Sequence, residues 1–266
     1  MPLAVCATPI GNLEDVTLRV LSELAEADVV LCEDTRHTRK LLERHGIKAR
    51  LLSYHEHNEA RRTAEVLPRL ETGERIALVS DAGLPGISDP GARLIAAALE
   101  AGVEVTVLPG PSAVETALVA SGLVAGRYQF LGYLPRGERA LRALAEELAR
   151  WPDAVVAFES PQRLTASLGV LARAIPDRQA AVCRELTKRF EEVRRGSVAE
   201  LAKGVGEVKG EVTLVVGAGE VAGPDENAAI AGMDELVAAG VPRRQAADLV
   251  ARLTGASRNR LYRASL

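Results

Sequence analysis

The chain has 266 residues, 47% of them hydrophobic and 26% charged, which is the composition of a globular protein with room for two domains of ordinary size. Its formal net charge of −3 provides no overall basic field, so a nucleic acid would have to be met by a local patch. The three cysteines are far apart and no leader or long apolar run is present, so the sequence predicts a cytoplasmic protein without disulfides, metal or membrane span.

Short apolar runs alternate with amphipathic segments in the first hundred residues. Strands are predicted at residues 3–7, 28–33, 50–53, 76–80 and 104–108. Helices are predicted at residues 17–27, 39–45, 58–70 and 90–101. Asp89 should cap the last of these helices, with Pro90 as its first residue. Apolar strands separated by helices indicate a sheet with a large parallel component, covered by helices.

A Pro-Gly-Pro break at residues 109–111 precedes a helix over 112–121 and then a second series of elements. Strands are predicted at residues 128–132, 154–158, 179–184, 190–195 and 211–216, and helices at 138–150, 162–174 and 197–203. A segment with Gly and Pro at 217–225 is the next predicted boundary. The predicted protein is α/β, with domains at residues 1–113 and 114–220 and a tail at 226–266.

The tail has a different composition from the rest of the chain. Its predicted helices, 228–239, 242–253 and 257–262, are joined by short turns, which is typical of a helix-turn-helix unit. From residue 243 onwards there are six arginines and one acid. The tail is either a solvated helical cap or an RNA contact. We favour RNA, because Arg258, Arg260 and Arg263 all lie in the last helix.

Three loops follow predicted strands, at residues 7–12, 81–88 and 108–113. They are rich in Gly, Pro and small residues, and none contains Lys or Arg. Neither the P-loop pattern nor the dinucleotide glycine fingerprint is present, which argues against a polyphosphate ligand. Such loops are either ordinary β-α connections or a site for a neutral or cationic ligand. S-adenosylmethionine fits the second description, because Asp81 or a nearby carbonyl could stabilise its sulfonium.

Nine motifs occur in order between residues 7 and 216, and they are ATPIGNLED, ADVVLCEDTRHTRKLL, SYHEHNE, SDAGLPGISDPG, LPGPSA, FLGYLPR, FESPQRL, CRELTKRFEEVRRG and GEVTLVV. Together they resemble the tetrapyrrole-methylase-like (class III) methyltransferases, and within them the ribosomal RNA small subunit methyltransferase I branch. The resemblance covers nearly the whole chain.

This resemblance implies two α/β domains with S-adenosylmethionine bound in the cleft between them, and a homodimer. It also implies 2′-O-methylation of a cytidine ribose in the decoding region of 16S ribosomal RNA, as naked RNA or in the 30S subunit. The family's cofactor contacts fall on Pro9, Asp81, Gly83, Pro85, Ile87, Ser88, Ser112 and Ala113, and on Leu134 and Phe158 at strand ends of the second domain. Leu84 stands where a small polar residue, usually Thr, is expected.

A ribose 2′-hydroxyl is a poor nucleophile, so a general base would help by about 10²–10⁴-fold. The candidates at predicted strand ends are Asp34, His55, Glu159, Glu185 and Lys188. Nearby cations that would hold phosphates are Arg36, Arg39, Lys40, Arg163, Arg184 and Arg189. The alternatives are an acidic helix start around Asp34 and a satisfied ion pair between Glu185 and Lys188. His55 and His57 have no third ligand, which argues against a metal.

Two other functions remain open from the sequence. One is methylation of a tetrapyrrole by the same fold, although the segments EDTR and SYHEHNE and the basic tail are not needed for a porphyrinoid. The other is a ribosome-binding factor without catalysis. Measured affinity for S-adenosylmethionine would separate that factor from an enzyme.

Overall fold

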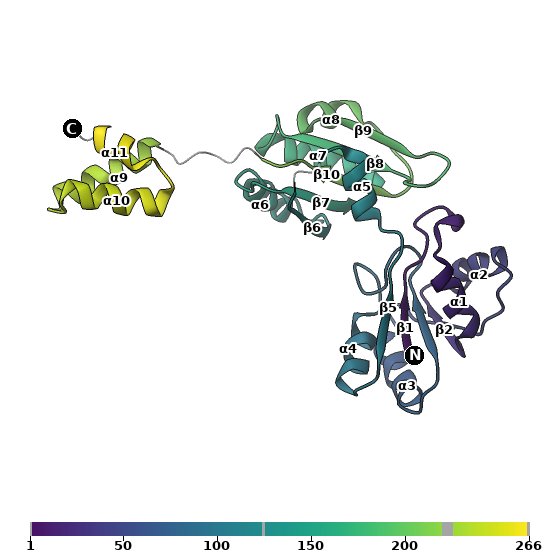
Figure 1. The fold of residues 1–266 in the computed structure, drawn as a ribbon. Coiled ribbons are helices and arrows are strands. Elements are labelled where there is room, and N and C mark those ends of the chain that lie inside the picture. Colours follow the sequence, from purple (N-terminus) through teal and green to yellow (C-terminus); the bar gives the residue numbers. More distant parts are fainter. Residues whose placement is uncertain (1, 124–125, 220–225, 265–266) are drawn as a thin grey trace. The chain divides into compact units, whose positions relative to one another are not determined.

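The computed structural model describes residues 2–123, 126–219 and 226–264 (Figure 1). The chain divides into two compact units, of which the first comprises Met1–Glu146 with Asp153–Ala218. The second comprises Glu147–Pro152 with Gly219–Leu266. Within the described ranges, no helix is long and apolar enough to cross a membrane.

The first unit begins with a five-stranded sheet in which every neighbouring pair of strands is parallel. Its strand order is β3-β2-β4-β1-β5. The strands are β1 (Leu3–Cys6), β2 (Val29–Cys32), β3 (Leu51–Ser53), β4 (Ile76–Val79) and β5 (Val105–Leu108). Because parallel strands end at the same edge, the segments that follow all five strands begin along one edge of the sheet.

Helices cover both faces of this sheet. Leu3, Val5 and Leu78 pack against the helices α3 (Glu59–Glu71) and α4 (Ala92–Glu100). Alternate residues, such as Ala4 and Cys6, pack against the helices α1 (Leu18–Glu26) and α2 (Thr35–Arg44) instead. The connection from β1 to β2 and the one from β4 to β5 run in opposite directions across the sheet. The topological switch point, where open α/β sheets hold ligands, therefore lies between the adjacent strands β1 and β4.

Two predicted helix starts are wrong. Helix α4 begins after Gly91, so Asp89 is not its cap and Pro90 is not its first residue. Gly91 has φ 140°, and a Cβ there would lie 3.0 Å from Leu78 Cδ2 in β4. The close approach of Gly91 to this strand therefore sets where α4 begins. Helix α2 begins at Thr35 rather than at residue 39, because the side chain of Asp34 accepts a hydrogen bond from the Arg36 N–H and caps the helix.

The second sheet of this unit is mixed. Its order is β6-β7-β10-β8-β9, in which β6 and β7 are parallel and the other neighbours are antiparallel. The strands are β6 (Tyr128–Tyr133), β7 (Ala154–Glu159), β8 (Gln179–Arg184), β9 (Glu192–Ser197) and β10 (Val212–Val216). The helices are α5 (Ala113–Ser121), α6 (Glu138–Leu148), α7 (Pro161–Ala174) and α8 (Val198–Gly204). The α/β class with a large parallel component is confirmed.

In the second unit, the described residues 226–264 form the helices α9 (Glu226–Ala238), α10 (Arg243–Thr254) and α11 (Arg258–Ala264). They enclose a small apolar core that includes Met233, Ala247 and Leu261. Gly240 and Gly255, with φ 90° and 75°, form the turns between the helices. The predicted three-helix tail is confirmed, whereas residues 220–225 of the predicted linker lie outside the described residues.

The start of helix α4 can be tested with two glycine variants. Gly91→Ala should lower the free energy of unfolding by about 2–4 kcal/mol, because it combines backbone strain with overpacking. Gly102→Ala, at the other end of α4, is the matched control, because Gly102 has φ 73° but open space around it. It should cost only about 1 kcal/mol. Equal losses in urea denaturation would show that the contact with Leu78 does not matter.

Candidate active site at the carboxyl edge of the first sheet

The three predicted loops meet at the switch point. Thr8 and Gly83 exchange two backbone hydrogen bonds, of 2.8 and 3.1 Å, between the loop after β1 and the loop after β4. The Thr8 hydroxyl also donates to the Ser80 carbonyl at 3.0 Å. In the loop after β5, a Cβ on Gly110 would lie 2.9 Å from the Cβ of Ala7. The loops therefore form one assembly that the backbone itself holds together.

The central loop, residues 81–88, combines buried and exposed positions. Gly83 and Pro85 are buried, whereas Ile87 and Ser88 are exposed. Ser88 has φ 63°, a left-handed conformation that costs a residue with a side chain about 1–3 kcal/mol. Strain of this kind persists where the surrounding structure imposes it, often at a functional site. This loop is therefore shaped to present Ile87 and Ser88.

Asp34 is tied to the central loop and to its own helix. Its N–H donates to Asp81 Oδ1 at 3.1 Å, and its carboxylate accepts from the Arg36 N–H at 2.8 Å. The Arg36 guanidinium lies 2.6 Å from Asp34 Oδ2 and holds the pKa of Asp34 well below its usual range. A carboxylate with so low a pKa is a weak proton acceptor, so the geometry favours the structural interpretation of Asp34.

Two other carboxyls at this edge have raised pKa values. Burial and the negative charge of Glu33 raise the pKa of Asp89 to about 6, although a hydrogen bond from the Ser80 side chain acts to lower it. Burial and the charge of Asp81 also raise the pKa of Glu33. The three loops contain no Lys or Arg. Neighbouring carboxylates that lack a cation would be stabilised by a positively charged ligand, so this donor set fits a sulfonium compound.

His55 has a defined tautomer. Asn58 Oδ1 accepts from the His55 backbone N–H at 3.0 Å, so the Asn58 amide nitrogen faces His55 Nε2, also at 3.0 Å. That nitrogen donates, and His55 Nε2 must accept, which places the ring proton on Nδ1. Nδ1 is buried and has no partner among the described residues. His55 Nε2 is thus already occupied, so this nitrogen is poorly placed to act as a base.

Glu159 and Arg163 have structural partners. Glu159 is buried, and its carboxylate accepts from the Ser160 N–H at 2.7 Å and the Ser167 hydroxyl at 2.5 Å. Arg163 lies 3.1 Å from the same carboxylate and donates to the Pro135 carbonyl at 2.7 Å. These bonds fix the start of α7 and the turn after β6. Because the Glu159 carboxylate and the Arg163 guanidinium are engaged in these bonds, neither group is well placed to bind a substrate.

Glu185 and Lys188 lie in a strained turn after β8. Glu185 and Thr187 have φ of 52° and 65°. Lys188 Nζ lies 2.9 Å from Glu185 Oε1 and 3.1 Å from Glu211 Oε2. Burial lowers the pKa of Lys188, but the bonds to the two carboxylates outweigh it and leave this pKa raised. Burial likewise raises the pKa of Glu185, but bonds from Glu211 and Lys188 leave it lowered.

The same turn touches the first loop. A Cβ on Gly11 would lie 2.5 Å from Lys188 Cγ and 2.7 Å from the Leu186 carbonyl, so only glycine fits there. The structure therefore brings Lys188 beside the loop that contains Pro9, whereas sequence reasoning could not place the two together. Gly11 and Thr8 lie in the predicted loop 7–12 and Asp89 was predicted as a helix cap, but the sequence did not single out any of the three as site residues.

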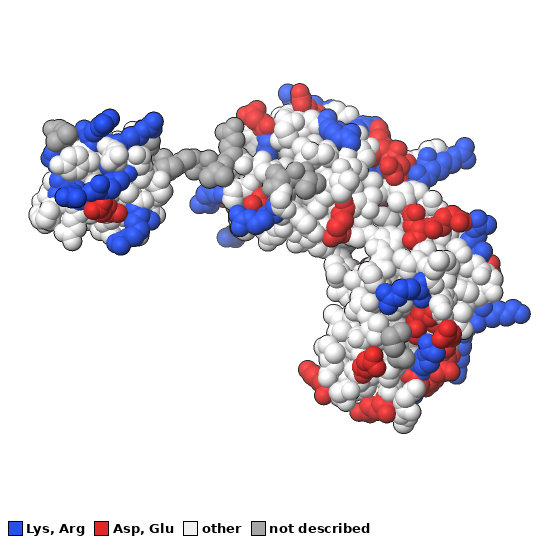
Figure 2. All heavy atoms as spheres, viewed as in Figure 1, with Lys and Arg blue, Asp and Glu red and all other residues white. Residues whose placement is uncertain are grey.

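The other predicted cations differ in their partners. Arg184 pairs with Glu192 at 3.0 Å, and the Arg189 guanidinium lies 5.6 Å from the centre of the Phe190 ring. Arg39 and Lys40 are exposed on α2. In the second unit, Arg258 pairs with Asp248, and the charged side chains on the visible face are mostly basic (Figure 2).

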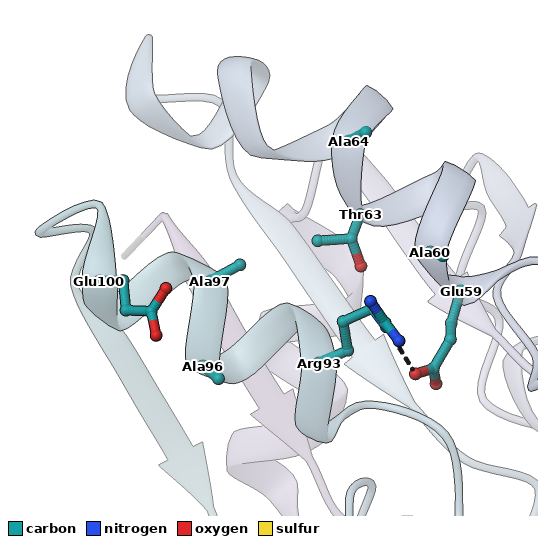
Figure 3. Close-up of a pocket in the computed structure, with 8 residues that line it drawn as sticks. All are labelled: Glu59, Ala60, Thr63, Ala64, Arg93, Ala96, Ala97 and Glu100. Atoms are coloured by element: carbon teal, nitrogen blue, oxygen red, sulfur yellow. Dashed lines mark hydrogen bonds and ion pairs between the residues drawn. The ribbon is translucent and has the colours of Figure 1, made fainter.

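A groove of about 550 Å³ lies elsewhere, between α3 and α4 (Figure 3). Half of its lining residues are alanines, and two of the others, Arg93 and Glu59, form an ion pair with each other at 3.2 Å. It offers no chemistry comparable to that of the loop assembly. No group of three or more possible metal ligands occurs in the described part of the chain.

The raised pKa of Asp89 predicts how stability depends on pH. Below about pH 4 the carboxyl is protonated both folded and unfolded, and the folded protein loses stability as pH rises through about 6. Without ligand, Asp89→Asn should raise the free energy of unfolding by about 1 kcal/mol at pH 7.5 and the melting temperature by about 2–4 °C. At pH 4 the gain should vanish. An equal gain at both pH values in thermal denaturation would contradict this assignment.

Comparison with known proteins shows that this fold is that of the tetrapyrrole methylases. The family of tetrapyrrole (corrin/porphyrin) methylases matches residues 2–202. Among solved structures, uroporphyrin-III C-methyl transferase from Thermus thermophilus, complexed with S-adenyl homocysteine, has a TM-score of 0.58 and 21% identity, covering 82% of this chain and 97% of that one. The methyltransferase CobJ has a TM-score of 0.63 and 21% identity, covering 84% and 95%. These likenesses show a shared fold.

Two relatives that share more than 40% of their residues with this chain are both named ribosomal RNA small subunit methyltransferase I. The protein of Mesorhizobium japonicum is 45% identical and covers 98% of this chain and 90% of its own length. That of Mycobacterium tuberculosis H37Rv is 46% identical, with 98% and 93% covered. The RsmI C-terminal HTH domain matches residues 225–266, which agrees with the predicted helix-turn-helix tail. The chain therefore belongs to the tetrapyrrole methylases and, within them, to the ribosomal RNA small subunit methyltransferase I family.

Proposed function

We propose that this protein transfers a methyl group from S-adenosylmethionine to the 2′-oxygen of a cytidine ribose in 16S ribosomal RNA, in the decoding region of the small subunit. The observation that carries the proposal is the cation-free loop assembly at the switch point between β1 and β4, tied by the Thr8–Gly83 bridge. Membership in a family of ribosomal RNA methyltransferases supports the choice of substrate.

The loop assembly would hold the cofactor through its backbone and small side chains. We assign this role to Pro9, Asp81, Gly83, Pro85, Ile87, Ser88, Ser112 and Ala113, with Phe158 from β7. Leu134, which is 2% exposed, is assigned the same role. When bound, S-adenosylmethionine supplies an electrophilic methyl group on a sulfonium. Asp81, Asp89 and Glu33 provide the negative charge that favours such a cation over an anion.

The acceptor ribose is assigned to the turn that carries Lys188. Asp34, His55 and Glu159 have polar atoms committed to hydrogen bonds within the protein. Lys188 is a charged ammonium that touches the first loop through its stem. From there it would stabilise the negative charge that develops on the 2′-oxygen as its proton passes to solvent water. The oxygen then forms its bond to the methyl carbon while the bond from that carbon to the sulfonium sulfur breaks, which leaves S-adenosylhomocysteine. Glu185 and Glu211 position the ammonium.

We place the two domains of the enzyme at residues 1–113 and 114–220, since each carries one of the two sheets, with 226–266 as an accessory tail. We further propose that the enzyme acts in the cytoplasm as a homodimer on RNA in the 30S subunit. Sedimentation of the free protein would test the dimer.

Lys188 can be tested with three variants. Lys188→Met should lower kcat for methyl transfer to small ribosomal subunits by about 10²–10³-fold, because one donor to the developing oxyanion is lost. Lys188→Arg should keep part of the rate. The exposed Lys203 of α8 provides the control, and Lys203→Met should behave as the wild type. Affinity for S-adenosylmethionine should stay within about twofold throughout. Near-full turnover by Lys188→Met would exclude this role.

The tail can be tested through salt dependence. Replacing Arg258, Arg260 and Arg263 together by Ala should weaken RNA binding and reduce the slope of log K against log salt by about 1–2, because phosphate contacts release counterions. Cofactor affinity should not change. The control replaces Arg19, Arg61 and Arg139, which are equally exposed and have no assigned role. If both triple variants have the same slope, the tail is only a cap.

A further inference from the structure

Tyr133 is the exposed member of an aromatic cluster in the second sheet. Phe130 and Phe158 meet edge to face, with ring centres 5.0 Å apart, and Tyr133 lies 5.6 Å from Phe158 in the same manner. Phe130 and Phe158 are partly buried, whereas Tyr133 is 63% exposed. A large exposed ring that packs against Phe158, which in turn packs against Phe130, is a ready stacking surface.

A β-bulge sets the face on which Tyr133 lies. Phe130 pairs with Val156 and Tyr133 pairs with Phe158, so β6 has one residue more than β7 between these pairs. Gly132, with φ 67°, lies inside the bulge. Since paired residues of parallel strands share a face, the extra residue puts Tyr133 on the face of Phe130 and Phe158. Without it, Gly132 would pair with Phe158, and Tyr133 would point to the opposite face.

This is the sheet face that meets the loop assembly. The apolar cluster that contains Phe130 and Phe158 also includes Ile10, Ala82 and Ala113, one residue from each of the three loops or their ends. A Cβ on Gly132 would lie 3.8 Å from the Ser88 hydroxyl. The bulge therefore brings an exposed aromatic ring next to the proposed cofactor site.

The charges around Tyr133 restrict what its ring can bind. Besides burial, the carboxylates of Glu211, Asp89, Glu159 and Glu33 raise the pKa of the Tyr133 hydroxyl, so all four lie within electrostatic reach. Lys188 and Arg163 pair with Glu211 and Glu159, whereas Asp89 and Glu33 have no ion pair among the described residues. The charge of these two carboxyls would repel the phosphates of an RNA backbone. An uncharged base, and in particular one with an exocyclic amino group that can donate to a carboxylate, fits this surrounding.

We propose that Tyr133 is the stacking platform for the nucleobase of the nucleotide whose ribose is methylated. This inference rests on the proposed function and adds the residue that positions the acceptor base. The adenine of the cofactor fits the Tyr133 ring less well than the acceptor base does. A ligand held by the three loops would contact the half-buried Phe158, whereas the Tyr133 ring faces outward. Tyr133 was absent from the site residues expected from sequence, because its face depends on the bulge.

The test uses the full chain and two substitutions of Tyr133. Tyr133→Leu removes the ring and Tyr133→Phe keeps it, so the second variant is the matched control. Methyl transfer from tritiated S-adenosylmethionine to unmodified small ribosomal subunits gives KM and kcat, and calorimetry gives the Kd of the cofactor. We expect Tyr133→Leu to raise KM for the subunit by about 10–100-fold and Tyr133→Phe by less than about threefold. The Kd of the cofactor should change in neither.

Base stacking is also measured directly, without turnover. An oligoribonucleotide with the fluorescent cytosine analogue pyrrolocytosine at the target position should lose fluorescence on binding to the wild type and to Tyr133→Phe, but not to Tyr133→Leu. The inference is overturned if Tyr133→Leu quenches like the wild type, or if its main effect is a higher Kd for the cofactor. If the wild type quenches but does not methylate the subunits, the proposed function fails while Tyr133 keeps its role in base binding.

Discussion

The two hydrogen bonds between Thr8 and Gly83 are the constraint on which the rest of the candidate site depends. They join loops that follow adjacent parallel strands but lie 75 residues apart in the chain. The buried hydroxyls of Thr8 and Ser80 reinforce this junction through the carbonyls of Ser80 and Gly83. With the junction fixed, Asp81 can accept from the Asp34 N–H and so tie in the segment after β2. Backbone bonds of this kind hold a binding site rigid without charged side chains.

Charge is distributed unevenly over the molecule, and this unevenness matches the proposed division of roles. The edge with the three loops contains carboxyls with raised pKa values and no loop cation. Exposed cations occur instead on α2 and on the C-terminal helices (Figure 2). A cationic methyl donor and a polyanionic acceptor need opposite fields, and the chain supplies them on different elements. Lys188 is a cation that lies beside the first loop, and the carboxylates of Glu185 and Glu211 hold its ammonium.

Backbone strain is concentrated in the same places. Among the described residues, the non-glycine residues with positive φ are Ser88, Glu185 and Thr187, and all three lie in segments assigned to the site. Gly91 and Gly132 add a helix start and a bulge that other residues would not allow without strain. Such conformations cost stability and are retained when they orient a group for function. Here they present Ser88, position Lys188 and place Tyr133 on the sheet face that meets the loops.

The sequence by itself determined the alternation of strands and helices, the cation-free loops and the basic three-helix tail, because periodicity, glycine placement and charge are local properties. Only the tertiary structure decided which partners each acid has. Asp34 and Glu159 are occupied by Arg36 and Ser167, while Asp89, expected to cap a helix, is a half-buried carboxyl. It also fixed the tautomer of His55 and the face of Tyr133. These outcomes depend on partners and registers that come from distant segments, and no pattern of neighbouring residues encodes them.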